Sequence, residues 1–270
     1  LRAALESRGL GDTLERLLVS DNTPAKVSVA AIPGFVTVAE LSEFGSYGEA
    51  SPIAIELGVI PANVPAIRSG HARVQDQGSQ LAVLALLEAE TVAEDSLWLD
   101  MCAGPGGKAA LMAAIATQRG VGFEANEISP HRAKLVEDSL VPISPVRVSV
   151  GDGRKMGDGG ERFSRILLDA PCTGLGALRR RPESRWRKSA SDLSDLSKLQ
   201  RDLFAAAWDS LMPGGVLGYV TCSPHLSETT AQVSWAEAKF GKDLELISAN
   251  MILNKLNPSL ALDESFRTAQ

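Results

Sequence analysis

The feature that most constrains the fold of this chain is an alternation of short apolar runs and amphipathic segments that begins near residue 71. Parallel strands need crossover connections, usually helices, so such an alternation predicts a mostly parallel sheet with helices on both faces. Strands are expected at 97–101, 121–125, 146–150, 165–168 and 216–221. Helices are expected at 78–93, with Ser79 as its cap, and at 106–117, 130–140, 196–211 and 228–240.

The first 70 residues follow a different pattern. Leucines at 5, 10, 14, 17 and 18 are spaced as on one face of a helix, and short strands are expected at 27–32 and 35–38. We therefore expect a small α+β subdomain at 1–70 and a larger α/β domain at 71–270. A chain of 270 residues is long enough for such a pair.

Composition narrows the class of protein. No apolar run reaches the roughly 18 residues of a membrane span, so we expect no membrane partner. The chain has three cysteines, three histidines and no C-x-x-C spacing, which disfavours a zinc site and fits a reducing, cytoplasmic setting. The net charge of −6 argues against a protein that coats nucleic acid, although a local basic patch remains compatible with it. We expect a monomer without a metal.

All three cysteines follow runs that are expected to be buried strands. Cys102 lies in the segment 100–108, Cys172 in 167–174 and Cys222 in 218–223. The carboxyl ends of strands in an open α/β sheet are where ligands bind, so three thiols are expected at one rim. A lone cysteine is more often a small core residue, but two at equivalent strand ends favour a thiol-based active site beside a nucleotide-like cofactor.

A glycine-rich turn lies between the first strand and the first helix of the α/β part. Gly104, Gly106 and Gly107 would let the backbone approach a ligand closely. Glu127 lies about 20 residues further on, where an acid can accept hydrogen bonds from ribose hydroxyls, and Glu124 is a competing candidate. The turn has neither the G-x-G-x-x-G nor the P-loop spacing, so it suits a nucleoside without phosphates, such as S-adenosylmethionine.

Two further segments carry candidate contacts. Asp152 follows the third strand, where its carboxylate could meet an adenine amine or simply close a turn. A basic run directly after the Cys172 segment has the composition of a single-stranded nucleic-acid contact, and a solvated charged loop is the alternative. Its members are Arg179, Arg180, Arg181, Arg185, Trp186, Arg187 and Lys188.

These motifs, taken together and in order, resemble the RsmB/Sun (Fmu) family of RNA cytosine-5 methyltransferases. The matching segments are 73–81, 100–108, 126–127 with Arg132, 151–152, 169–174, 199–200 and 221–223. The pairing of Asp-Ala-Pro-Cys at 169–172 with Thr-Cys-Ser at 221–223 is the most specific of them. The resemblance implies a Rossmann-like class I methyltransferase fold at 71–270, an RNA-binding subdomain at 1–70, and a truncated C-terminal end.

The resemblance also implies site residues and roles. Cys222 would add to cytosine C6, Cys172 would assist release of the enzyme, and Asp169 would hold the N3/N4 edge of the base, with Lys108 pointing to the same pocket. The implied cofactor is S-adenosyl-L-methionine and the implied substrate is RNA, ribosomal RNA before tRNA. The implied cofactor contacts are Cys102, Ala103, Gly104, Pro105, Gly106, Gly107, Lys108, Glu127, Arg132, Asp152 and Asp169.

Two other function classes stay open at this point. A methyltransferase acting on an exocyclic amine would carry Asn/Asp-Pro-Pro-Tyr/Phe where this chain has Asp-Ala-Pro-Cys, and neither it nor a protein methyltransferase would need a thiol. A non-catalytic RNA-binding assembly factor would need neither the cofactor residues nor the thiols.

Overall fold

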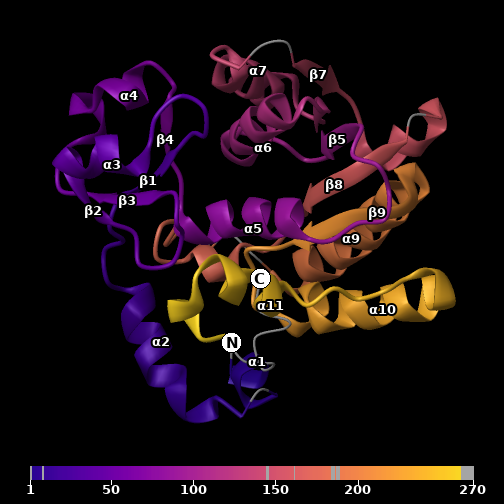
Figure 1. The fold of residues 1–270 in the computed structure, drawn as a ribbon. Helices are drawn as coiled ribbons and strands as arrows, with labels where there is room; N and C mark the ends of the chain where they lie inside the picture. The colour runs from indigo at the N-terminus through magenta and orange to yellow at the C-terminus, as the bar shows by residue number, and fades with distance from the viewer. Residues whose placement is uncertain are drawn as a thin grey trace.

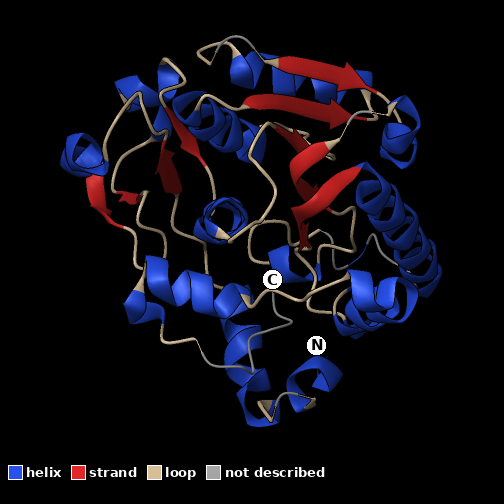
Figure 2. Ribbon diagram, turned by 45° about the vertical axis from the view of Figure 1, so that its right-hand side comes forward, coloured by secondary structure: helices blue, strands red, loops and turns tan. Residues whose placement is uncertain are grey.

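The structure is a computed structural model, and it describes residues 2–7, 9–143, 146–160, 162–183, 186 and 189–262. Its larger part is a five-stranded, wholly parallel sheet in the order β7-β6-β5-β8-β9, with helices on both faces (Figure 2). The strands are β5 (Leu97–Asp100), β6 (Gly122–Glu127), β7 (Arg147–Val150), β8 (Phe163–Asp169) and β9 (Leu211–Val220). The predicted α/β, Rossmann-like architecture is therefore confirmed.

The helices form one layer on each face of this sheet. Alternate residues of a strand point to opposite faces, so Trp98 and Leu99 of β5 belong to two different hydrophobic clusters. The first cluster contains side chains of α5 (Gln77–Glu88), α6 (Gly107–Arg119) and α7 (Pro130–Leu140). The second contains side chains of α9 (Ala190–Ser210), which also packs against α10 (Thr230–Phe240).

Local sequence signals set where these helices begin and end. Helix α7 has Pro130 at its first position and Ser129 as a side-chain cap, and α9 begins with a capping box of Ser189 and Asp192. Helix α6 starts after Gly106, whose φ of 104° lies in the left-handed region that favours glycine. That turn brings the backbone of 104–107 to the carboxyl end of β5.

The smaller part is an antiparallel sheet in the order β2-β3-β1-β4. Its elements are α1 (Arg2–Glu6), α2 (Leu14–Asp21), β1 (Ser28–Ala31), α3 (Val38–Leu41), β2 (Gly45–Tyr47), β3 (Ala54–Leu57), α4 (Pro65–Arg68) and β4 (Ala72–Val74). The last strand, β4, lies past residue 70, and only Gln75 and Asp76 separate it from α5. Helix α5 thus lies between the two sheets, and α11 (Ala249–Leu256) packs against it (Figure 1).

Several predicted elements differ from the structure. Helix α9 begins six residues earlier than expected, and β9 begins five residues earlier. The strand expected at 35–38 is wrong, because Thr37 and Glu40 form a capping box that starts α3 there. The leucine pattern at 5–18 forms two helices instead of one, with Gly9 between them at a φ of 70°. Helix α5 ends at Glu88, five residues earlier than expected, and its N-cap position is Asp76 and not Ser79. None of the described helices combines the length and the apolar character that crossing a bilayer requires.

Candidate active site

Cys172 and Cys222 lie side by side at the carboxyl rim of the parallel sheet. Cys172 follows β8 and Cys222 follows β9, and their sulfur atoms are 3.3 Å apart. The two loops are joined by main-chain hydrogen bonds, from the N–H of Ala170 to the carbonyl of Val220 and from that of Gly176 to the carbonyl of Cys222, each 2.8 Å. The register of two neighbouring strands therefore brings together two cysteines that are 50 residues apart in the chain.

The thiols differ in their tendency to ionise. A hydrogen bond from the Cys222 thiol lowers the pKa of Cys172 to about 6 against the opposing effect of burial, and the Thr221 hydroxyl and the Gly174 N–H help. The same hydrogen bond, with burial, raises the pKa of Cys222. The pair therefore loses its first proton near neutral pH as one unit, with the charge held on Cys172 and the remaining proton shared.

Cys102 behaves differently. Burial, followed by the charges of Asp100 and Asp169, raises the pKa of the Cys102 thiol to about 12. This thiol stays protonated and is not a nucleophile. The main chain of Cys102 is part of the glycine-rich turn, and the sequence predicts that Cys102 contacts the cofactor.

Lys108 and Asp169 form an ion pair next to the thiols. The Nζ of Lys108 lies 2.7 Å from Oδ2 of Asp169, and the side chains are 17% and 31% exposed. Burial disfavours the charged amine, but the charge and hydrogen bond of Asp169 outweigh it and raise the pKa of Lys108. A fixed cation and a carboxylate therefore lie beside the two thiols, an arrangement that can stabilise charge on a group bound there.

Asp100 is a site residue that sequence reasoning missed. It ends β5 and is fully buried, and neither carboxylate oxygen has a hydrogen-bond partner of normal geometry among the described residues. Burial and then the charge of Asp169 raise the pKa of Asp100 to about 7. The charge of Lys108 and a hydrogen bond from the Cys102 main chain offset this rise only in part. A buried carboxylate at the glycine-rich turn suits a cationic ligand such as S-adenosylmethionine, because a positive group would further offset the cost of burying the charge.

The glycine-rich turn is closed by Glu127 and Arg132. Glu127 is almost completely buried, accepts hydrogen bonds of 3.0 Å from the N–H groups of Gly104 and Ser129, and pairs with Arg132 at 3.4 Å. Arg132 also donates to the carbonyl of Gly104. A β-carbon at Gly104 would clash with both side chains, so the turn tolerates only glycine in this arrangement.

The competing acid, Glu124, lies three residues before Glu127 in β6. It pairs with Arg147 of β7 at 3.4 Å. Asp152 follows β7 as expected, but its carboxylate accepts hydrogen bonds from the side chain and the N–H of Arg154. The hydrogen bonds from Arg154 lower the pKa of Asp152, so this carboxylate is ionised and already paired.

Two exposed apolar residues at the same rim were not singled out in the sequence. Ile128 directly follows Glu127 and is 62% exposed, and Val150 ends β7 and is 55% exposed. Apolar side chains at the carboxyl ends of adjacent strands offer a surface for a flat ring such as adenine. An apolar residue immediately after Glu127, the acid predicted to contact a ribose, was the sequence signal that could have identified Ile128.

The basic loop is partly described. Arg179 donates to the carbonyls of Thr23 and Pro24, at 3.0 and 3.3 Å, and Arg180 pairs with Asp76 at 2.5 Å. Arg181 is exposed, and Trp186 is 86% exposed. Arg185, Arg187 and Lys188 lie outside the described residues. Of the predicted RNA contacts, Arg179 therefore also connects the loop to the segment after α2, and Arg180 connects it to the start of α5.

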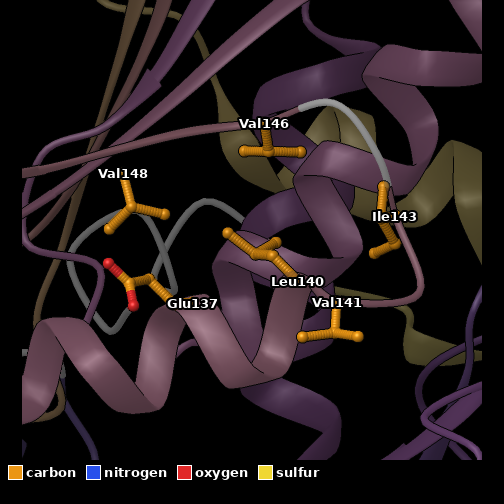
Figure 3. Close-up of a pocket in the computed structure, with 6 residues that line it drawn as sticks. All are labelled: Glu137, Leu140, Val141, Ile143, Val146 and Val148. Carbon is orange, nitrogen blue, oxygen red and sulfur yellow. The ribbon is translucent and has the colours of Figure 1, made fainter.

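A shallow pocket lies elsewhere, between the end of α7 and the amino end of β7 (Figure 3). Its lining is Glu137, Leu140, Val141, Ile143, Val146 and Val148. It contains neither a thiol nor the glycine-rich turn, so it is separate from the rim. Within the described ranges, no group of three or more His, Cys, Asp or Glu side chains is placed to hold a metal ion.

Known proteins match both the sequence and the fold. A family model described as 16S rRNA methyltransferase RsmB/F matches residues 85–257. A putative methyltransferase of Mycobacterium tuberculosis (strain CDC 1551 / Oshkosh) is 47% identical over 226 residues, which cover 82% of this chain and 49% of that protein. Ribosomal RNA small subunit methyltransferase B of Enterobacter sp. (strain 638) is 37% identical over 192 residues, 69% of this chain and 43% of that protein.

The chain thus spans about half the length of the curated relatives it matches. Among solved structures, a methyltransferase homolog protein from Pyrococcus horikoshii superposes with a TM-score of 0.73 at 21% identity, covering 88% of this chain and 82% of that one. The family match covers more than half of the chain and includes the glycine-rich turn and both thiol loops. The chain belongs to the RsmB/F family of methyltransferases, whose Rossmann-like fold uses S-adenosylmethionine, as its motifs predict.

Proposed function

We propose that this protein transfers a methyl group from S-adenosylmethionine to C5 of a cytosine in RNA, with ribosomal RNA as the substrate. The observation that carries the proposal is the pair of thiols 3.3 Å apart beside the Lys108–Asp169 ion pair. Methylation of an exocyclic amine needs no nucleophile from the enzyme, because the amine itself attacks the methyl group. Carbon C5 of cytosine, in contrast, must first be activated by addition of a nucleophile at C6. Two thiols at one rim fit the second reaction.

In the first step, Cys222 bonds to C6 of the cytosine. Its proton passes to the Cys172 thiolate, which already shares a hydrogen bond with it. The electron pair of the C5–C6 double bond is thereby released into the ring, and C5 becomes nucleophilic. Asp169 holds the N3/N4 edge of the base while Lys108 fixes the carboxylate.

The cofactor, when bound, would supply an electrophilic methyl group to C5, and the bond from that methyl to the sulfonium sulfur would break as the new C–C bond forms. A base then takes the C5 proton, the electron pair of that C–H bond restores the C5–C6 double bond, and the sulfur of Cys222 leaves as a thiolate. Cys172, now protonated, donates a hydrogen bond to this leaving thiolate. Cys172 therefore assists both the deprotonation of Cys222 and its departure.

Residues at the rim of β5, β6 and β7 would bind the cofactor. We assign the ribose to Glu127, the adenine to the surface of Ile128 and Val150 with Asp152 at its edge, and the methionine part to the turn at 102–108 above Asp100. Glu127 already accepts two N–H groups, so it is held in place before a ribose hydroxyl arrives. The exposed Trp186 and the basic loop, together with the small sheet, would contact single-stranded RNA.

The proposed function is tested with the purified protein, ribosomal RNA and methyl-labelled S-adenosylmethionine. Nuclease digestion and mass spectrometry should find the label in 5-methylcytidine. Bisulfite sequencing of RNA from cells without the protein should then locate the cytosine that loses its methyl group. Label in an N-methylated nucleoside or in protein would overturn the proposal.

Glu127→Ala is expected to weaken cofactor binding by roughly 1–3 kcal/mol, the cost of leaving buried hydrogen-bonding groups unpaired. The substitution removes both a ribose acceptor and the acceptor of the Gly104 N–H. Calorimetric titration with S-adenosylmethionine measures the effect. Glu137→Ala on the exposed face of α7 is the control, and equal affinity in both variants would contradict the assignment of Glu127.

Neutralising Arg181, Arg185 and Arg187 together is expected to lower RNA affinity and to flatten its dependence on salt by up to roughly three counterions. This set leaves in place Arg179, which contacts Thr23, and Arg180, which pairs with Asp76 at the start of α5. Binding to a single-stranded RNA is measured at several salt concentrations. The control with the same change of charge is Lys239, Lys242 and Lys255 to Gln; if its salt slope falls as much, the loop is not a specific contact.

A further inference from the structure

Glu228 is a buried carboxylate that neither the sequence motifs nor the proposed mechanism uses. It ends the short 3-10 helix Leu226–Glu228, six residues after Cys222, and it is fully buried. Its side chain accepts three hydrogen bonds from the protein. The donors are the N–H of Thr173 at 2.8 Å, the Thr173 hydroxyl at 2.5 Å and Nε2 of Gln200 at 3.0 Å.

These bonds connect Glu228 to the loop of Cys172. Thr173 is the next residue after that cysteine, and it gives both its N–H and its hydroxyl proton to Glu228. Gln200 also donates to the carbonyl of Pro171 at 2.9 Å, so the residues on both sides of Cys172 are held through one network. Glu228 therefore holds the loop that carries Cys172, through hydrogen bonds to the residues on both sides of it.

The same network reaches the loop of Cys222. The hydroxyl oxygens of Thr173 and Ser223 are 3.0 Å apart. Because the Thr173 proton goes to Glu228, Ser223 is the donor in this bond. Ser223 directly follows Cys222, so a chain of buried side chains runs from one thiol loop through Thr173 to the other. Tyr219 of β9 further fixes Glu228 by donating to its carbonyl at 3.0 Å.

We propose that Glu228 is a positioning residue that sets the contact between the two thiols through the Thr173–Ser223 hydroxyl bridge. The effect of Glu228 on catalysis rests on the proposed function. The contact between the two thiols can be measured without RNA. In this role Glu228 acts by accepting hydrogen bonds, and the effect on the thiols does not depend on its negative charge.

The alternative, an electrostatic role, makes the opposite prediction. Removing a nearby negative charge would favour the Cys172 thiolate, whereas losing the hydrogen bond from Cys222 would disfavour it. The charged or titratable groups that face the thiols from the surrounding elements would be unchanged in either case. They are Lys108 of α6, Asp169 of β8 and Tyr219 of β9.

Three substitutions separate the two roles. Glu228→Ala removes the acceptor, and Thr173→Val removes the hydroxyl bridge but keeps the Thr173 N–H bond and the shape of the side chain. Glu228→Gln removes the charge and can keep every hydrogen bond. The amide oxygen of the glutamine would accept from the Thr173 N–H and from Gln200. The amide nitrogen would donate to the Thr173 hydroxyl, which would then donate to Ser223. Glu237→Ala on the exposed face of α10 is the matched control.

The experiment follows iodoacetamide alkylation of each cysteine against pH by mass spectrometry. In the wild type, Cys172 should react with a midpoint near its lowered pKa of about 6. We expect Glu228→Ala and Thr173→Val to move that midpoint upward by about one pH unit or more, and Glu228→Gln and the control to leave it in place. Cys102 should stay unmodified in every folded variant, so it reports unfolding within the same sample.

A midpoint that does not rise in Thr173→Val would overturn the proposal even if Glu228→Ala fails to fold. A midpoint that falls in Glu228→Gln would show that charge dominates. With RNA present, Glu228→Ala should lower single-turnover methyl transfer at least about tenfold at unchanged cofactor affinity, and Glu228→Gln should restore it. Failure of the wild type to methylate RNA would reject the proposed function and leave the alkylation result standing.

Discussion

Cys222→Ala is expected to abolish methyl transfer and to form no covalent complex with RNA, whereas Cys172→Ala should accumulate one. Without Cys222 no sulfur can add to C6. Without Cys172 the main cause of the raised pKa of Cys222 is removed, and nearby Lys108 favours its thiolate, so attack continues. The leaving thiolate, however, loses its hydrogen-bond donor, and release becomes slow.

The measurement is a denaturing gel of protein incubated with RNA and S-adenosylmethionine. A slower-migrating protein–RNA band should be present for Cys172→Ala and absent for Cys222→Ala. The double variant is the control, because its adduct should disappear if Cys222 is the attacking sulfur. An adduct trapped by Cys222→Ala would show that the two cysteines have exchanged roles, and a fully active Cys222→Ala would exclude the thiol mechanism.

Asp169→Asn should reduce single-turnover methyl transfer by about 10²–10³, the usual effect of removing a group that stabilises developing charge. The amide has nearly the same shape, but it cannot form an ion pair with Lys108, and it offers the base one acceptor oxygen in place of two. Loss of the carboxylate also removes the main cause of the raised pKa of Lys108, so the amine would lose its proton more readily.

The rate is measured with saturating cofactor and RNA, and cofactor affinity is measured separately. Asp158→Asn, an exposed carboxylate outside the rim, is the control. If Asp169→Asn weakens cofactor binding but leaves the saturated rate intact, Asp169 binds the cofactor and does not hold the base. A retained rate and retained affinity together would remove Asp169 from the site.

The catalytic sheet could be predicted from sequence because its strands are short, apolar and separated by capped helices. Strand-end positions for Cys172 and Cys222 followed from that pattern alone. The small sheet was harder to predict from the sequence. Apolar residues at 35–36 favour a strand, but the capping box of Thr37 and Glu40 starts a helix there instead. A local hydrogen-bonding signal outweighed a weak strand preference.

The supporting residues of the site could not be predicted in the same way. Asp100 is the polar end of an apolar run, and its burial beside Asp169 becomes visible only when the chain is folded. Glu228 receives hydrogen bonds from Thr173, 55 residues earlier, and nothing in its neighbours indicates that contact. Motifs identify residues that perform chemistry, whereas the residues that hold them depend on which strands become adjacent.

The short connection between β4 and α5 limits how this protein can be divided. Strand β4 pairs with β1 of the small sheet, Gln75 donates from its N–H to Ser28, and Arg73 donates to the carbonyl of Ser139 at the end of α7. A fragment cut at residue 71 would carry β4 away from its sheet and leave one edge of β1 without a neighbour. The small sheet and the catalytic rim are therefore best expressed, labelled and crystallised as a single piece.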